Sequence, residues 1–406
     1  MINAAWLLAS SIITPQQNVW VAYSGGVDSH VLLDLARQCF NNVHAIHINH
    51  NLSHDDIVWQ QHCEAVCAAV KIPLRCITVD AKPKPSQSPE EASRLARRQA
   101  WREVLNKNDV LLVAHHADDQ AETVLFRLLR GAGPKGLSGI KVISKVGQAT
   151  LWRPLLGISK QQLLDYATFN NLNWLQDQSN TDDHYDRNYL RKHVVPLLLQ
   201  RWPAAIANIN RAAKLCGQLE NFIAPQIMNV LASMTDKNQV LNLTLLRSYS
   251  PQWQQEILRL WLQQQDLHPS SQHVKMILQQ VINARPDAMP EYTLADKVVR
   301  RSQERLYLLE SSNRVQQEYS SSWNLQQALL LPNGVILNVA DISNDLQFLD
   351  KLQQSNVTVR LGTHGRKAKK IFQQHGIPPW ERSKYPLLFI NDRLVSIVGV
   401  WCSARV

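Results

Sequence analysis

The first 200 residues alternate short apolar runs with segments whose apolar positions recur at helical spacing. Four apolar runs predict strands, at residues 18–23, 42–49, 75–80 and 109–116. A helical pattern follows each run, in the third case after a loop rich in Pro, Ser and Lys. Strands that alternate with helices are typical of parallel βαβ units, so we expect an α/β domain with a doubly wound parallel sheet. Such sheets bind ligands beyond the carboxyl ends of their strands.

The pattern changes after Pro196, and the change predicts three domains. Helical spacing dominates as far as residue 284, and short alternating runs appear from Tyr292 onward. The segments 332–334 and 391–393 are typical of hairpin turns. We therefore expect an N-terminal catalytic domain, a helical middle domain and a small mixed α/β C-terminal domain. Their predicted bounds are 1–202, 203–320 and 321–406.

The stretch Ser24–Ser29, Ser-Gly-Gly-Val-Asp-Ser, joins the first predicted strand to the helix after it. Backbone N–H groups at a helix N-terminus attract anions, and the hydroxyls of Ser24 and Ser29 lie beside them, so phosphate is the expected guest. A Walker loop is excluded because its lysine is absent. The structural alternative is a strand-to-helix turn in which Asp28 caps the helix.

The fourth predicted strand ends in His-His-Ala-Asp-Asp, residues 115–119. Two imidazoles and two carboxylates would meet there, at the edge where this fold keeps its ligands. Asp118 and Asp119 could hold Mg²⁺ on ATP oxygens, and one of them or Asp28 could bind an ammonium group. Which carboxylate does which task stays open. The alternative is a solvated helix start, where acidic residues favour the helix dipole.

Histidines and cysteines near the second strand do not form a metal-binding pattern. Strand periodicity places His44 and His50 on one face and His47 on the other, and no Cys or His pair completes a tetrahedral zinc set. We interpret these histidines as structural or RNA-facing. Cys63 and Cys67 lie four residues apart on a predicted helix, which favours buried thiols over a redox pair.

The segment Gly131–Gly136 matches the spacing of a dinucleotide fingerprint but follows a helix instead of linking a strand to a helix. We therefore reject a dinucleotide site. The glycines favour a loop that lets a ligand or RNA approach the backbone. A plain helix C-cap followed by a loop is the alternative.

Charge points to a polyanionic partner. The chain has a formal net charge of +10, and from residue 360 to the end nine Lys or Arg face only two acidic residues. Within this stretch four cations are packed closely, and such clusters repel unless a polyanion neutralises them. The cluster consists of Arg366, Lys367, Lys369 and Lys370. Arginines on the predicted helices of the first domain, such as Arg94, could face phosphates or simply be solvated or paired.

Composition argues against a membrane or secreted protein. Hydrophobic residues make up 45% of the chain, yet no run approaches the ~18 apolar residues of a membrane span. The N-terminal apolar run has no basic region before it, so we expect no secretory signal. Six scattered cysteines without a C-x-x-C pair indicate reduced thiols. We expect a cytoplasmic protein.

The loop resembles the pyrophosphate loop of the N-type ATP pyrophosphatases. Within that superfamily, further stretches resemble the tRNA(Ile)-lysidine synthase family, and together they span nearly the whole chain. These stretches are His47–Ser53, Pro89–Trp101, His115–Thr123, Arg187–Pro196 and residues 362–388, which include Ile-Pro-Pro-Trp-Glu-Arg.

The resemblance implies an adenine nucleotide alpha hydrolase-like fold, use of ATP and Mg²⁺, and ligation of free L-lysine to the wobble cytidine of isoleucine tRNA with a CAU anticodon. It also implies that the middle and C-terminal domains contact the tRNA and that the enzyme is a monomer or homodimer. The implied catalytic residues are Asp28, Asp118, Asp119, Arg97 and Arg191. ATP would be bound by Ser24, Gly25, Gly26, Val27, Asp28, Ser29, His50 and His115. The RNA contacts would be Arg130, Arg187, Arg366, Lys367, Lys369, Lys370 and Arg382, and Mg²⁺ would be held by Asp118 and Asp119.

Two other functions remain open from the residues. A tRNA-thiolating enzyme on the same fold would use paired cysteines or a bound cluster, and Cys63 with Cys67 on one helix is a poor substitute. A nucleotide-responsive RNA-binding protein would perform no chemistry. Pyrophosphate release with RNA would separate an enzyme from a binder, and dependence on lysine would exclude thiolation.

Overall fold

The computed structural model divides into two compact units, residues 1–223 and 224–406. Each unit is described by itself. The residues that the structure describes are 2–51, 55–83, 88–175, 186–285, 288–311, 318–342, 349, 352–362 and 365–403.

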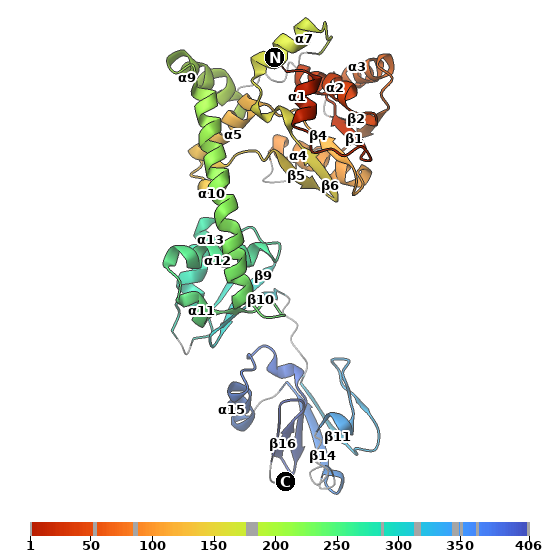
Figure 1. Cartoon of the computed structure of the whole chain (residues 1–406). Coiled ribbons are helices and arrows are strands. Elements are labelled where there is room, and N and C mark those ends of the chain that lie inside the picture. The colour runs from red at the N-terminus through yellow and green to blue at the C-terminus, as the bar shows by residue number, and fades with distance from the viewer. Residues whose placement is uncertain are drawn as a thin grey trace. The chain divides into compact units, whose positions relative to one another are not determined.

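The first unit is built on a six-stranded sheet (Figure 1), with strand order β3-β2-β1-β4-β6-β5. All neighbouring strands pair in parallel except β5 and β6, which form an antiparallel hairpin at the edge. This confirms the predicted parallel α/β sheet and adds the hairpin, which the sequence pattern missed. The strands are β1 (Val19–Ala22), β2 (Val43–Asn49), β3 (Leu74–Thr78), β4 (Val110–Leu112), β5 (Ile143–Val146) and β6 (Ala149–Trp152).

Helices cover both faces of this sheet because its strands are apolar on both sides. Val19 and Val21 of β1 belong to one core cluster, together with residues of α2 and α3. Trp20 and Ala22, which alternate with them, pack in a second cluster against Trp101 of α4. The helices of this unit are α1 (Ala4–Ala9), α2 (Val27–Cys39), α3 (Asp55–Ala69), α4 (Pro89–Val104), α5 (Ala117–Leu129), α6 (Pro134–Leu137), α7 (Lys160–Phe169), α8 (Asp186–Tyr189) and α9 (Val195–Arg201).

The strand order reverses at β1, which pairs with β2 on one side and with β4 on the other. The loops that follow β1 and β4 leave the same edge of the sheet and diverge to α2 and α5. A crevice at such a switch point is where doubly wound sheets bind ligands. The two motifs predicted to carry chemistry, at residues 24–29 and 115–119, lie in these two loops.

The middle of the chain begins with the long helix α10 (Ala205–Met234). Beyond it, helices pack with a four-stranded antiparallel sheet around the fully buried Trp261. The predicted helical character is confirmed, and the sheet accounts for the alternating runs that begin near Tyr292. The elements are α11 (Leu243–Arg247), α12 (Pro251–Gln263), α13 (Ser271–Ile277), β7 (Leu241–Asn242), β8 (Glu291–Leu294), β9 (Lys297–Ser302) and β10 (Arg305–Glu310).

The C-terminal part is a mixed α/β structure with a five-stranded antiparallel sheet of order β11-β14-β15-β16-β17. Asn391 and Asp392, both with positive φ, form the predicted turn between β15 and β16. The predicted turn at residues 332–334 joins a second, two-stranded hairpin. The elements are β11 (Tyr319–Trp323), β12 (Leu329–Leu330), β13 (Ile336–Leu337), β14 (Val357–Leu361), α15 (Arg366–Gln374), β15 (Leu387–Ile390), β16 (Arg393–Ile397) and β17 (Trp401–Cys402).

None of the helices in the described part of the chain combines the length and the apolar composition of a membrane-spanning segment.

Candidate functional site

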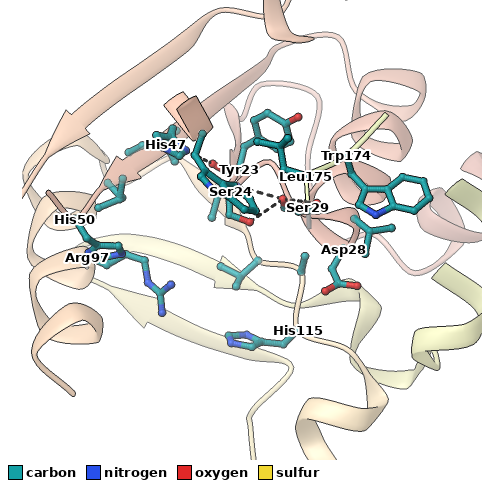
Figure 2. A pocket seen from close by; sticks show the side chains of 18 of the residues that line it. Tyr23, Ser24, Asp28, Ser29, His47, His50, Arg97, His115, Trp174 and Leu175 are labelled. Carbon is teal, nitrogen blue, oxygen red and sulfur yellow. Dashed lines mark hydrogen bonds between the residues drawn. The ribbon is translucent and has the colours of Figure 1, made fainter. Parts of the chain in front are cut away.

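The loop after β1 has the form of an anion site. The first N–H groups of α2 have no intrahelical acceptor, because its first internal bond runs from His30 N to Gly26 O. The two serine hydroxyls of the loop lie 3.1 Å apart, and Ser29 Oγ accepts from Ser24 N. Figure 2 shows Ser24 and Ser29 facing each other at the wall of the cavity. The loop therefore offers both amides and hydroxyls to an anionic ligand.

Gly25 is required by the shape of this loop. Its φ is +85°, a region that side chains avoid, and a Cβ there would lie 3.1 Å from Cys63 Sγ and 3.3 Å from Trp59 on α3. Its carbonyl also accepts a hydrogen bond from Leu175 N. Gly26 has an ordinary φ of −77°, and the atom nearest to a Cβ there would be Ser24 Oγ at 3.6 Å. Of the two glycines, Gly25 is therefore the one at which the loop is pressed against α3.

The second loop places His116 among three carboxylates. His116 is the N-cap of α5, and its ring nitrogens lie 3.7 Å from Asp28, 3.6 Å from Asp118 and 3.5 Å from Asp119. Burial alone would lower the pKa of His116, but the nearby carboxylates of Asp118, Asp119 and Asp28 raise it above its ordinary value. In turn, His116 helps to hold the pKa values of Asp118 and Asp119 below theirs, against the effect of burial. The imidazolium of His116 and the carboxylates of Asp118 and Asp119 therefore favour each other's charged forms.

Lys160, which belongs to neither motif, contacts both the loop after β1 and the loop after β4. Its Nζ lies 2.6 Å from Asp28 Oδ1, and its backbone N donates to Asp118 Oδ2 at 2.9 Å. The lysine is the first residue of α7, after the capping residue Ser159. One residue of α7 thus contacts the carboxylates of both motifs.

Arg191 anchors the other side of α5. Its guanidinium makes two bonds of 2.7 Å to Glu122, a side chain only 3% exposed, and one of 3.3 Å to Asp119. The hydrogen bonds to Glu122 raise the pKa of Arg191 above its ordinary value. Arg187 also reaches this carboxylate, at 3.6 Å, and pairs with Glu90 at 3.1 Å. Both arginines are therefore committed to internal ion pairs.

These elements surround a cavity of about 670 Å³, large enough for a nucleotide. Figure 2 shows Asp28 and Trp174 at one end and His50 with Arg97 at the other. Among the described residues, Arg97 Nε, His50 Nδ1 and Trp101 Nε1 are buried without a hydrogen-bond partner. Buried orphan groups are rare in proteins, so this end of the cavity calls for a polar ligand.

His115 lies on the floor of the same cavity as a neutral ring. Its Nδ1 accepts from Arg153 Nε at 3.1 Å. Burial lowers the pKa of His115 to about 3; Asp119 opposes this, and Arg153 and Arg97 add to it. The imidazole can accept or donate a hydrogen bond there, but it adds no positive charge to the cavity.

The structure brings together most of the residues predicted to bind ATP or to act in catalysis. Eight of them line the cavity: Ser24, Gly26, Val27, Asp28, Ser29, His50, Arg97 and His115. Gly25 supports the loop from behind, and Asp118, Asp119 and Arg191 are linked to the cavity through His116 and Lys160. Their roles stay predictions.

The residues predicted to contact RNA are spread over both units. Arg130 is exposed at the end of α5, with its guanidinium over Phe126. Lys367 donates to Leu394 O, and Arg382 donates to Ile377 O. All four cations of the cluster lie on α15 and are exposed: Arg366, Lys367, Lys369 and Lys370. Their contacts with RNA stay predictions.

Sequence reasoning missed Lys160, Arg153 and Glu122. Lys160 has no local signal, because its partner Asp28 is 132 positions away. His116 was part of the predicted motif but received no role of its own. Cys63 and Cys67 are buried, which confirms the prediction of buried thiols, and burial raises the pKa of Cys67 to about 12 and that of Cys63 further. Among the described residues no group of three or more His, Cys, Asp or Glu is arranged to hold a metal ion.

Three family models match the chain. A PP-loop domain matches residues 3–198, a TilS substrate binding domain matches residues 241–307, and a TilS substrate C-terminal domain matches residues 329–406. Together they cover the sheet with its cavity, the middle sheet with α11 to α13, and the C-terminal sheet from β14 onward.

Curated relatives are similar over almost the full length. A tRNA(Ile)-lysidine synthase of Coxiella burnetii is 34% identical over 95% of this chain and 90% of its own length. Enzymes of the same name from Xanthomonas campestris and Serratia proteamaculans are 35% and 36% identical, over 100% and 95% of this chain and 95% and 92% of their own lengths. Among solved structures, the U34-tRNA thiolase NcsA of Methanococcus maripaludis aligns with 53% of this chain and 76% of its own, at 19% identity and a TM-score of 0.46.

Proposed function

The chain belongs to the tRNA(Ile)-lysidine synthase family, and we propose that the cavity at the β1/β4 switch point is where it forms lysidine. The protein is a ligase that joins lysine to carbon 2 of the wobble cytidine of tRNA(Ile), consuming ATP and releasing AMP and pyrophosphate. The observation that best supports this site is the Ser24–Ser29 loop, which lines the cavity at the N-terminus of α2 beside a cluster of carboxylates.

The first step is adenylation of the base. The cytidine O2 attacks the α-phosphorus of ATP, and the bond from that phosphorus to the bridging oxygen of pyrophosphate breaks. The loop amides and the two serine hydroxyls hold the departing pyrophosphate, as a helix N-terminus holds other anions. Arg97 faces the cavity from α4, and its positive charge stabilises the phosphoryl group during the transfer. An anticodon base is unpaired, so it can enter the cavity without melting a helix.

The second step is displacement of AMP by the substrate lysine. Its neutral ε-amine attacks carbon 2 of the activated ring, the bond from that carbon to the adenylate oxygen breaks, and the nitrogen loses a proton. Asp28, in the loop, binds the lysine ammonium and accepts the proton that turns it into the neutral amine, and the proton lost after attack passes to solvent. A carboxylate of ordinary pKa is a weak base for this task, so close placement of the two groups matters more than basicity.

Mg²⁺ fits this site only as a companion of ATP. Mg²⁺ is usually held by one or two carboxylates together with substrate phosphates, so it needs no protein cage. Both oxygens of Asp119 are bonded, one to His116 N and one to Arg191. Asp118 has one oxygen bonded to Lys160 N and is the better of the two predicted ligands. Bound there, the ion would neutralise charge on the polyphosphate.

We assign the tRNA body to the exposed cations of the C-terminal domain. The helix α15 buries Ala368, Ile371 and Phe372 in its own domain and leaves its lysines and its arginine exposed. Such a face suits a phosphate backbone, whose contacts are electrostatic and independent of sequence. Because its substrate is a tRNA, we propose that the protein acts in the cytoplasm, as a monomer or homodimer.

The test is incorporation of radiolabelled lysine. The protein is incubated with ATP, Mg²⁺, labelled lysine and unmodified tRNA(Ile) that carries a CAU anticodon. We expect label that is acid-precipitable and RNase-sensitive, one AMP per lysine incorporated, and no label when the cytidine is replaced by uridine. Label that appears without ATP, or none with all components present, would refute the assignment.

A further inference from the structure

His115 and Arg153 meet because two parallel strands end side by side. The strands β4 and β6 are neighbours in the sheet, and their register pairs Leu112 with Trp152, the last residue of each strand. His115 lies in the loop that follows β4, and Arg153 comes directly after β6. The carboxyl ends of parallel strands lie at one edge of a sheet, so both residues leave the sheet at the edge where the cavity lies.

Arg153 is held in place by the β5/β6 hairpin. It is buried, and its Nη1 donates to Lys141 O at 2.7 Å and to Ser144 Oγ at 3.0 Å. Its Nε donates to His115 Nδ1 at 3.1 Å. The N–H groups of a guanidinium are fixed in one plane, so the bonds to the hairpin also orient the bond to the imidazole. The guanidinium therefore connects the hairpin to the floor of the cavity.

The bond from Arg153 determines which ring nitrogen of His115 carries the proton. Burial lowers the pKa of Arg153 to about 10, so the guanidinium is still charged near neutral pH and can only donate. His115 Nδ1 must therefore accept. The ring is neutral, because burial holds the pKa of His115 well below its ordinary value. A neutral imidazole has a single N–H group, which here lies on Nε2.

A neutral donor suits a phosphoryl group in this cavity. His115 lines the cavity, and Figure 2 shows its ring on the floor, across from Ser24 and Ser29. Since Nδ1 is occupied by Arg153, the ring can offer only its Nε2–H to a ligand. Phosphate oxygens accept hydrogen bonds, so an N–H attracts them, whereas a bare nitrogen lone pair would repel them.

We propose that Arg153 is a positioning residue for the adenylation step, which fixes His115 as the Nε2–H tautomer so that this N–H donates to an oxygen of the transferred phosphoryl group. The β5/β6 hairpin contributes by holding Arg153. The catalytic part of this inference rests on the proposed function, because it requires ATP in this cavity. The tautomer of His115 can be tested without any activity.

The first experiment is NMR spectroscopy of the enzyme labelled with ¹⁵N in its histidine rings. It compares the wild type with Arg153→Met, Arg153→Lys and the control Arg98→Met. Arg98 donates from α4 to Lys145 O of the same hairpin, at 3.2 Å, and does not line the cavity. The chain has 14 histidines, so His115→Gln identifies the signals of His115 by their loss. Thermal unfolding of each variant confirms that the protein is folded.

In the wild type and in Arg98→Met we expect a protonated Nε2 and an unprotonated Nδ1 whose signal shows that it accepts a hydrogen bond. Arg153→Met should move the Nδ1 signal toward that of a nitrogen without a donor. Arg153→Lys should restore it, because an ammonium also only donates. A protonated Nδ1 in the wild type, or an unchanged Nδ1 signal in Arg153→Met, overturns the inference.

The second experiment measures pyrophosphate release with tRNA(Ile) and ATP in a double-mutant cycle. Arg153→Met should lower kcat and kcat/KM together, by about 10- to 100-fold. In the His115→Gln background the same substitution should lower kcat by less than about twofold, because Arg153 acts through His115. A full loss in that background overturns the positioning role. If the wild type releases no pyrophosphate, the proposed function is refuted, and the NMR spectra still decide the tautomer.

Discussion

The charges of the cavity and the charges of α15 are organised in opposite ways. Around the cavity, His116 lies close to three carboxylates, Lys160 pairs with Asp28, and Arg191 bonds the buried Glu122. On α15, the basic side chains are exposed, and like charges lie side by side on one helix. The charges around the cavity are paired within the protein, whereas the cations of α15 are exposed to solvent.

This difference separates two kinds of electrostatic function. Paired, partly buried charges hold a fixed geometry, so each has one task and its loss is specific. Exposed charges of one sign act together over a distance, so each can be replaced and all are screened by salt. Substitutions in the cavity should therefore change chemistry or stability at single positions, and substitutions on α15 should change affinity in small additive amounts.

The largest effect is expected for Asp28→Ala. The variant loses the proposed ammonium ligand and the partner of Lys160, so lysine incorporation should fall by about 10³-fold or more, equivalent to about 4 kcal/mol of transition-state stabilisation. Asp28 is part-exposed at the start of α2, so the fold should persist. Activity is measured with labelled lysine, and folding by circular dichroism. A folded variant with wild-type turnover would remove the loop carboxylate from the mechanism.

Next in size is the loss of stability in Arg191→Met. The substitution leaves Glu122, 3% exposed, without its two short hydrogen bonds. Breaking a fully buried pair costs about 3–5 kcal/mol. Because the Arg191 side chain is 39% exposed and Arg187 remains near Glu122, we expect the free energy of unfolding to fall by about 2–3 kcal/mol. Denaturant unfolding measures this loss of stability, and Arg130→Met, at an exposed position, is the control. Equal losses in the two variants would contradict a stabilising pair between Arg191 and Glu122.

The two loop glycines provide a matched pair. Gly25→Ala combines a positive φ with a close contact to Cys63 and should destabilise the protein by about 2 kcal/mol. Gly26→Ala has room and an ordinary φ, so its effect should stay within about 0.5 kcal/mol. Unfolding free energies test this without any assay of activity. A larger loss for the second variant would show that the loop is not held at Gly25.

The smallest effect is expected on α15. Replacing Lys369 and Lys370 by Glu should weaken tRNA binding about tenfold at low salt and reduce the slope of log affinity against log salt by about one or two, with no loss of stability. The control has the same change of charge at Lys71 and Lys107, exposed residues that precede β3 and β4 at the opposite edge of the sheet from the cavity. Filter binding at several salt concentrations gives both slopes. Identical slopes in the two variants would exclude a specific role of α15.

The sequence was informative where the pattern is local. Apolar runs and helical spacing predicted β1 to β4 with their helices, and the turn at Asn391 and Asp392 was predicted from its residue types. The β5/β6 hairpin was missed because each strand has only four residues and β5 is half exposed. Short strands of this kind gain their stability from the neighbouring sheet, which the local pattern does not contain.

The site was predictable to the same extent. Residues 24–29 and 115–119 could be recognised from the sequence, because each motif lies within a single loop and has a distinctive composition. The fold brings both loops to one crevice. Lys160 and Glu122 act through partners that are distant in sequence, and a lysine after a serine cap looks like any helix start. Such pairs can be predicted only when it is known that α7 packs on α2 and that α5 packs on the segment of Arg191.

The most direct test of the account is a crystal structure of the protein with α,β-methylene-ATP. We expect the β- and γ-phosphates within hydrogen-bonding distance of the amides and hydroxyls of residues 24–29. A nucleotide bound elsewhere, or a loop whose amides remain turned away from the phosphates, would contradict the central claim that this loop at the β1/β4 crevice holds the departing pyrophosphate.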